Sequence, residues 1–324
     1  MFDLPLVVGA VIYANLIALM GIGFSLTYAT SKIPNFAHGS FVIIGAYVTY
    51  HLTEAMRVVP NPIPTYMIVS VAFLFTGLAA FFMYVIVIGG LKRRGVGMIG
   101  ITISTLAIEF LIISAVRIYL TSFPLWGGSF LGTFLLRNID FSFMNLPGIL
   151  YVSTLLCITL VTVLHIMLTR TKFGIAMRSV IENSSLSAVF GVDVERLQSI
   201  SWFLAGGLAG LSGSVLPLWF TVDPNTGYVL LITVIAASIF GGLSSIYGVI
   251  IGSYVVGFLE ILGTNSLANV FGSWITPYRA LLPLLVIFLC LLVAPNGIVG
   301  LLKSPRIRYM YSRARERVSR WKPW

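Results

Sequence analysis

Charged side chains are scarce in this sequence. Only 9% of its 324 residues are Asp, Glu, Lys or Arg, and 58% are hydrophobic, whereas soluble domains carry roughly a quarter charged residues. So few charges could not cover the surface of a soluble protein of this size, which excludes that class. The apolar runs are long and do not alternate, so a β-barrel is not expected either. The composition predicts an all-α polytopic membrane protein.

Catalytic and metal-binding patterns are also lacking. No GxxxxGK[ST] phosphate-binding loop, HExxH or GxSxG pattern occurs. The three histidines are scattered, and Cys157 and Cys290 stand alone in separate apolar runs, so no metal site, disulfide or cofactor is expected. We therefore do not expect an enzyme, and any ATP hydrolysis that the chain needs would come from a partner.

Apolar sequence, in contrast, is abundant, and a membrane span needs about 20 such residues. We expect about eight or nine transmembrane helices, with candidates at 5–29, 38–54, 64–90, 97–120, 147–169, 197–220, 227–241, 246–263 and 279–301. No basic segment precedes the first run, so it is expected to remain as a span. The run 227–241 is short, which predicts a half-helix or a re-entrant segment. The stretch 30–38 predicts a broken helix, because Pro34 lacks an amide proton and steers Ile33 away from the helical region.

Basic residues are distributed unevenly. If the polar stretch 169–197 lies in the cytoplasm and the nine spans alternate, the segments 30–38, 90–97, 241–246 and the C-terminal tail lie on the same side. These segments then hold sixteen of the 20 Lys and Arg residues, as the positive-inside rule requires. The N-terminus is therefore expected outside and the C-terminus in the cytoplasm. The basic tail 303–324 is expected to bind anionic membrane lipid, at about 1 kcal/mol per basic residue, and no nucleic-acid partner is expected.

Polar residues inside the apolar runs are candidate functional groups, because their burial in lipid is costly. Glu109 falls near the middle of its span, so we expect it to be paired, protonated or in contact with a wet cavity. Glu260 lies nearer the outer end of its span, where an interfacial position is expected. For these two acids we favour a structural role. For Asn35, His38 and Ser40, at the first helix break, structural hydrogen bonding and substrate contact are weighed equally.

Two patterns of small residues concern helix packing. The stretch GGLAGLSG at 206–213 brings four glycines together, which predicts close approach of helices, either in a static contact or in one that shifts during transport. Residues 42–48 (VIIGAYV) and 249–255 (VIIGSYV) are nearly identical. They indicate either an internal repeat, as transporters often carry, or a chance match between apolar segments.

The longest polar interruption, 169–197, is referred to below as the central loop. Its sequence predicts two short helices, the second capped by Ser184 or Ser185 and ending at Gly191, and a cap at Asp193 for the next membrane helix. The first helix has an apolar side, which suits either a groove on a partner protein or the membrane surface. The residues of this side are Phe173, Ala176, Met177 and Val180.

Several short segments occur in a familiar order. They are IPNFAHG at 33–39, IGAY at 44–47, FGGLSS at 240–245 and PNGI at 295–298, together with Gly174, Arg178, Glu182, Asn183, Ala188, Gly191, Val192, Gly248, Gly252 and Glu260. In this order and spacing the chain resembles the permease subunits of branched-chain amino acid ABC importers, specifically their LivH-like member. That family usually has NFAHGE at the first segment. Ser40 stands here in place of the acid, which questions any role of that carboxylate.

The resemblance implies an ABC importer permease fold, with a transmembrane permease domain at 1–302, a cytoplasmic coupling loop at 169–197 and a tail at 303–324. It implies three kinds of protein partner, which are a second, LivM-like permease, two ATP-binding subunits and an extracytoplasmic solute-binding protein, in addition to the membrane lipid expected from the basic tail. Coupling to the ATPase is expected at Gly174, Arg178, Glu182 and Gly191. The translocation path is expected at Asn35, His38, Ser40, Gly241, Gly242, Ser244 and Ser245.

The expected cargo is a branched-chain or related amino acid. Importers of urea and short amides share the NFAHG-like pattern and remain an alternative. A second alternative is a self-sufficient secondary transporter that uses Glu109 as an ion or proton site and does not need the central loop.

Overall fold

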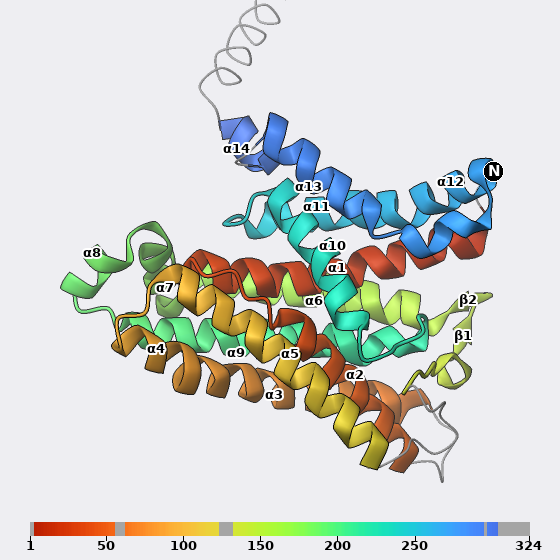
Figure 1. Cartoon of the computed structure of the whole chain (residues 1–324), viewed down its shortest axis with the longest axis horizontal. Helices are drawn as coiled ribbons and strands as arrows, with labels where there is room; N and C mark the ends of the chain where they lie inside the picture. Colours follow the sequence, from red (N-terminus) through yellow and green to blue (C-terminus); the bar gives the residue numbers. More distant parts are fainter. Residues whose placement is uncertain (1–2, 56–61, 123–131, 295–296, 304–324) are drawn as a thin grey trace, which may run out of the picture.

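The computed structural model describes residues 3–55, 62–122, 132–294 and 297–303, and the predicted basic tail falls almost entirely outside them. The described chain is a bundle of helices (Figure 1), with bounds α1 Leu4–Ser31, α2 His38–Ala55, α3 Pro62–Phe82, α4 Gly89–Arg93, α5 Met98–Ser122, α6 Gly148–Arg170, α7 Lys172–Glu182, α8 Ser184–Val189, α9 Val194–Val215, α10 Thr226–Gly241, α11 Ile246–Phe258, α12 Thr264–Phe271, α13 Leu281–Val293 and α14 Gly297–Lys303. Two strands, β1 Ser142–Phe143 and β2 Leu146–Pro147, pair in an antiparallel hairpin.

Shorter helical segments extend or join these elements. The π-helical segments Met83–Ile88 and Leu259–Gly263 connect α3 to α4 and α11 to α12, so each pair forms one long rod. Three 3-10 turns lie at Arg137–Ile139, Leu216–Leu218 and Ser273–Tyr278. Among the described residues, seven helical rods are long and apolar enough to cross a membrane. The all-α polytopic fold is therefore confirmed.

The helix break before α2 goes deeper than its sequence indicated. α1 ends at Ser31, Lys32 adopts a left-handed conformation with φ 58°, and no helix resumes until His38. The side chains of Ile33 and Asn35 in between are buried. His38 Nε2 lies 2.9 Å from the carbonyl oxygen of Met20, which is well inside α1. Beyond Lys32 the stretch 30–38 is therefore not an exposed loop, because the chain turns back into the protein and α2 starts there.

A second short helix begins beside the start of α2. α10 has only 16 residues, as the short run 227–241 predicted. The chain passes so close at this point that a Cβ atom on Gly39 would lie 2.5 Å from the carbonyl oxygen of Gly227. The two short helices α2 and α10 therefore start against each other, and only glycine fits at their contact.

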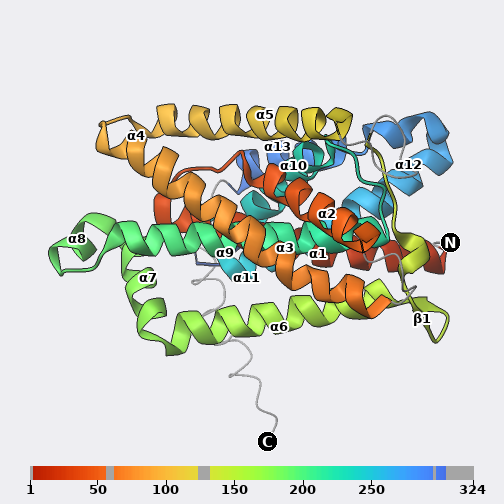
Figure 2. The ribbon, with the colours of Figure 1, turned by 90° about the horizontal axis from the view of Figure 1, so that it is seen from below.

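The core lies where α1 and α9 run past each other, antiparallel and almost completely buried (Figure 2). α2 crosses α9 with Gly45 against the backbone of Gly210, and with Gly213 against the backbone of Val42. The glycines at 206–213 thus support close helix packing, as predicted. α6 and α13, in contrast, cover the outside, and most of their apolar side chains are exposed or only partly buried.

The two ends of the bundle differ. α4, α7 and α8 lie at one end, while the described N-terminus, the β1–β2 hairpin and α12 lie at the other (Figures 1 and 2). The basic residues of α4 and of the central loop therefore share one end of the molecule.

Candidate functional site

The central loop folds into α7 and α8, as its sequence predicted. Thr171 caps α7 by accepting a hydrogen bond from the amide of Gly174 at 3.1 Å. Asn183 caps α8 by accepting from the amide of Leu186 at 3.0 Å. The predicted caps Ser184 and Ser185 are wrong because the extended backbone that a cap requires comes one residue earlier.

The exit from the loop agrees with the prediction. α8 ends at Val189, and Gly191 follows with φ 82°, a conformation that favours glycine. Asp193 then caps α9 by accepting from the amide of Arg196 at 3.1 Å. Helix, glycine and cap together fix the direction in which α8 projects.

The apolar side of α7 does not face outward. Met177 and Val180 are buried against the ends of the membrane helices, and Phe173 and Ala176 are half-buried. The hypothesis that this side enters a partner's groove is therefore wrong, because the protein itself covers it. On α7 only Ile175 is a large exposed apolar side chain, at 60%, whereas Leu186, Val189 and Phe190, on and just after α8, have exposed fractions of 53%, 82% and 78%.

The four predicted coupling residues divide into two kinds. Gly174 is buried, and a Cβ atom there would collide with the carbonyl oxygens of Met167 and Leu168 at the end of α6. Arg178, Glu182 and Gly191 are exposed. Glu182 also lines a shallow pocket between α7 and α8, formed with Ser179, Asn183, Leu186, Ser187, Phe190 and Val192.

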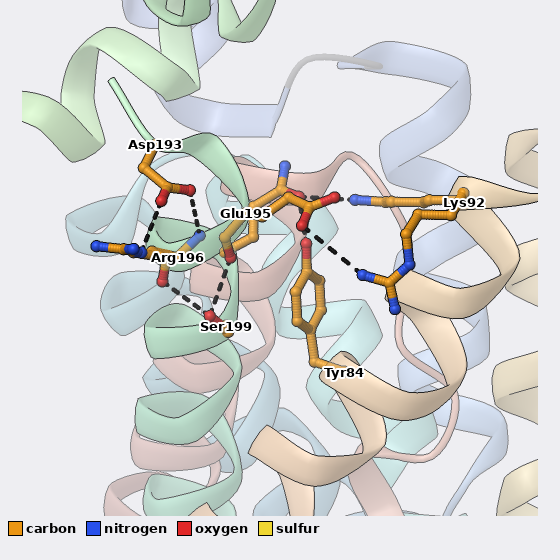
Figure 3. A network of polar contacts seen from close by, with 8 residues as sticks. Tyr84, Lys92, Asp193, Glu195, Arg196 and Ser199 are labelled. Atoms are coloured by element: carbon orange, nitrogen blue, oxygen red, sulfur yellow. Dashed lines mark hydrogen bonds and ion pairs between the residues drawn. The ribbon is translucent and has the colours of Figure 1, made fainter. Parts of the chain in front are cut away.

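A polar network lies where the central loop enters α9 (Figure 3). Arg196 pairs with Asp193 at 2.7 Å, and Arg93 approaches Glu195 at 4.0 Å. Both pairs are largely exposed, and such surface pairs contribute about 0–1 kcal/mol. Below them, Tyr84 and Lys92 reach toward the start of α9 (Figure 3). Sequence reasoning missed this network because it joins residues 84–93 to the start of α9, and Arg93 and Glu195 are about 100 residues apart.

Ser40, just after the first break, is brought together with Glu109 of α5. The Glu109 carboxylate is fully buried and accepts a hydrogen bond from the Ser40 amide at 3.0 Å and another from the Ser40 hydroxyl. Ser40 is the third residue of α2, where an amide has no partner within its own helix. Glu109 therefore caps α2 from a neighbouring helix, and the positive end of the α2 dipole favours its charge.

Two further contacts tie α5 to the starts of the short helices. Thr105 accepts from the amide of Phe36, inside the break, at 3.1 Å. Arg117, two turns beyond Glu109, donates to the side chain of Asn225 at 2.7 Å, directly before α10. α5 thus holds the starting points of both α2 and α10.

The other break residues are buried but less completely bonded. Both polar atoms of the Asn35 side chain and Nδ1 of His38 have no hydrogen-bond partner among the described residues. Each side chain is only 1% exposed. Buried polar atoms without partners are costly.

The turn at 241–245 is a separate location. A Cβ atom on Gly241 would collide with the carbonyl oxygen of Gly248, and Gly242 has φ 105°. Ser245 caps α11 by accepting from the Gly248 amide at 3.2 Å, whereas Ser244 is exposed. The structure therefore does not bring these residues together with Asn35, His38 and Ser40. The link between them is α1, whose Ser25 hydroxyl donates to the Leu243 carbonyl at 2.7 Å.

Glu260 is inside the protein, not at an interface with water as expected. Its carboxylate is 0% exposed and accepts from the Tyr13 hydroxyl at 3.0 Å and the Thr233 hydroxyl at 2.8 Å. Arg279 lies 3.7 Å away and supplies the opposite charge. The three partners come from three segments, so no local pattern could have identified them. Across the described ranges, no group of three or more His, Cys, Asp or Glu residues is placed to hold a metal.

We predict that Glu109→Leu lowers the stability of the protein by about 1–3 kcal/mol, because it leaves the buried Ser40 amide and hydroxyl without an acceptor. Glu109→Gln keeps one acceptor oxygen and is expected to change stability by less than about 1 kcal/mol. Thermal unfolding of the purified chain in detergent measures both. Ser104→Ala on the same helix is the control, since Ser104 bonds only within α5. An unchanged unfolding temperature for Glu109→Leu would refute the capping role.

Comparison with known proteins gives a consistent result. The family model for "Branched-chain amino acid transport system / permease component" matches residues 6–291. A protein named probable branched-chain amino acid transport permease protein LivH, from Methanocaldococcus jannaschii, is 38% identical over 292 residues, which are 90% of this chain and 91% of that protein.

More distant relatives match over a similar length. The high-affinity branched-chain amino acid transport system permease proteins LivH of Salmonella typhimurium and BraD of Pseudomonas aeruginosa are each 24% identical to this chain, over 87% of it and 91% of their own length. No solved structure matches. The matched residues include the first helix break, the central loop and most of the membrane helices. The chain therefore belongs to the permease-component family of branched-chain amino acid transport systems.

Proposed function

We propose that the chain is the transmembrane permease subunit of an ABC importer and forms half of its translocation path. A second, LivM-like permease forms the other half, two ATP-binding subunits supply the energy, and an extracytoplasmic solute-binding protein delivers the cargo. The N-terminus lies outside and the C-terminus in the cytoplasm. The observation that carries the proposal is α8, which projects exposed apolar side chains from the end of the bundle that also holds the basic residues of α4.

α8 is the element that we assign to docking. Val189 and Phe190 are the most exposed apolar residues of the central loop, and large exposed apolar groups beside polar ones are typical of protein interfaces. Arg178 and Glu182 flank them on α7 and provide charged contacts. Gly174 and Gly191 act differently, because Gly174 allows α7 to pack on α6 and Gly191 sets the direction of α8.

The cargo that we propose is a branched-chain or related amino acid. The support is the family and the names of its relatives in Methanocaldococcus, Salmonella and Pseudomonas. For the path we propose the buried, incompletely bonded residues Asn35 and His38 together with Ser40. The turn from Gly241 to Ser245 lies elsewhere, and we propose that it borders the cytoplasmic exit.

Deletion of residues 174–191 is expected to abolish uptake, because it removes the only contact that we assign to the ATP-binding subunits. The measurement is uptake of radiolabelled leucine by cells that lack their own branched-chain transport and produce all subunits. Immunoblotting of membranes shows whether the shortened chain is inserted. Uptake that persists in the deletion variant would refute the proposal and favour a self-sufficient transporter.

A further inference from the structure

We propose that Gln198 is the positioning residue through which movement of the central loop reaches the α1–α2 break. Gln198 lies in the second turn of α9, directly below the exit of the loop, and is 6% exposed. This inference rests on the proposed function, since the movement would begin when the ATP-binding subunits dock on α8.

The side-chain amide of Gln198 joins three segments. Its oxygen accepts from the Tyr84 hydroxyl at 2.6 Å and from the Lys92 ammonium at 2.7 Å, and its nitrogen donates to a backbone carbonyl of α1 at 2.8 Å. Two donors on one side and a carbonyl on the other fix the orientation of the amide. The amide is therefore bonded on both of its sides, through its oxygen to Tyr84 and Lys92 and through its nitrogen to α1.

The carbonyl that receives this bond is that of Thr30. Thr30 stands in the last turn of α1, two residues before Lys32, where the chain leaves the helix with φ 58°. The last four carbonyls of a helix have no partner within it, so Gln198 supplies one from α9. The start of the helix that follows the central loop is thus bonded to the residue that precedes the break.

The segment that bonds to the oxygen of Gln198 is also unusual. Tyr84 lies in the π-helical segment Met83–Ile88, and its ring packs against Trp202, one turn beyond Gln198, at 5.6 Å between centroids. Lys92 sits over the same ring at 5.3 Å. π-helical segments are rare and frequently occur at functional sites. Figure 3 shows Tyr84 and Lys92 converging on the first turns of α9.

The neighbouring charged pairs do not fit this role. The pairs Arg93–Glu195 and Arg196–Asp193 are mostly exposed, and Ser199 bonds only to its own helix. A shift of α9 could break these contacts at little cost. It could not displace Gln198 without moving Thr30 or leaving buried groups unpaired. The break that follows Thr30 contains Asn35 and His38. Their buried polar atoms without partners are free to form hydrogen bonds in a different conformation of the break.

The test uses the full assembly in proteoliposomes and measures leucine uptake per ATP hydrolysed. Gln198→Glu keeps an acceptor for Tyr84 and Lys92 but removes the donor to Thr30, and Gln198→Leu removes both. We expect both variants to assemble with the ATP-binding subunits and to lose at least about 5-fold in uptake per ATP, the lower end of typical coupling between sites. Arg93→Ala and Ser199→Ala are the controls and are expected to keep the wild-type ratio. Assembled Gln198 variants with a wild-type ratio would overturn the inference.

A second measurement separates this inference from the proposed function. Hydrogen–deuterium exchange of the segment 32–37 is compared in the purified chain alone, where no ATP-binding subunit is required. Loss of the bond to Thr30 is expected to speed exchange in Gln198→Leu but not in Ser199→Ala. Equal exchange in the two variants would overturn the link, whatever drives transport. Failure of the wild-type chain to bind ATP-binding subunits would instead refute the ABC assignment. The exchange measurement would still test the link between Gln198 and the break.

Discussion

Gly45→Val is expected to prevent correct packing of the membrane core. A Cβ atom on Gly45 already collides with the carbonyl oxygen and Cα of Gly210, and rigid helix backbone cannot move aside as a flexible side chain can. Overpacking of a dense core costs about 1–3 kcal/mol, and a collision of backbone with backbone is expected to exceed that range. We expect the variant to be lost from membranes or to aggregate in detergent, as size-exclusion chromatography of the extracted protein would show.

Gly90→Val is the matched control for this change. Gly90 is also helical, in α4, and nothing lies within 4 Å of the position that its Cβ would take. The same Gly→Val substitution is therefore made in a helix at a position where the added Cβ atom meets no neighbouring atom. A monodisperse Gly45→Val protein with wild-type uptake would contradict the close contact between α2 and α9.

The double variant Val189→Glu, Phe190→Glu is expected to abolish association with the ATP-binding subunits. Both side chains are more than three-quarters exposed, so their replacement should leave the fold intact. If they are central to the docking surface, each is expected to contribute about 2 kcal/mol or more, which corresponds to roughly 30-fold in affinity per residue. Co-purification of the subunits measures the loss, and uptake is expected to fall with it.

α12 provides a matched control with the same two residue types. Val270 and Phe271 are adjacent and exposed, with fractions of 76% and 59%, and α12 lies at the opposite end of the molecule (Figure 1). Val270→Glu, Phe271→Glu is expected to keep the ATP-binding subunits bound. Unimpaired co-purification by the α8 variant would show that docking occurs elsewhere.

Much of the fold follows from patterns that extend over a few residues. The apolar runs predict the membrane helices, Pro34 predicts the break, and the short run 227–241 predicts a short helix, which is the 16-residue α10. The end of α8 at Gly191 and the cap at Asp193 are equally local, since each depends on backbone conformation at one or two residues. Such signals need no knowledge of the rest of the chain.

What the sequence could not predict depends on contacts between distant segments. The depth of the break is visible only from the contact of His38 with Met20, and the environment of Glu109 only from Ser40, which is 69 residues away. The side of α7 that faces outward was misjudged for the same reason. An apolar helix face indicates burial, but it does not tell whether the protein itself or a partner covers it.

The contact of Glu109 with Ser40 also bears on the rival class. A secondary transporter that uses Glu109 would need its carboxylate to exchange ions or protons during the cycle. In this structure one carboxylate oxygen, Oε2, is engaged by the amide and hydroxyl of Ser40 at the start of α2, while Oε1 has no hydrogen-bond partner among the described residues. That arrangement favours a cap over a carrier group, and Glu109→Gln is expected to retain ATP-driven uptake.

The most direct test of the proposed function is leucine uptake into proteoliposomes, compared between this chain alone and the assembly with its second permease, ATP-binding subunits and solute-binding protein. We predict that leucine accumulates only in the full assembly, and only when ATP is present on the side of the ATP-binding subunits. Competition by isoleucine and valine, but not by urea or short amides, would identify the cargo class. Accumulation of leucine by this chain alone, driven by a proton gradient without ATP, would contradict the assignment.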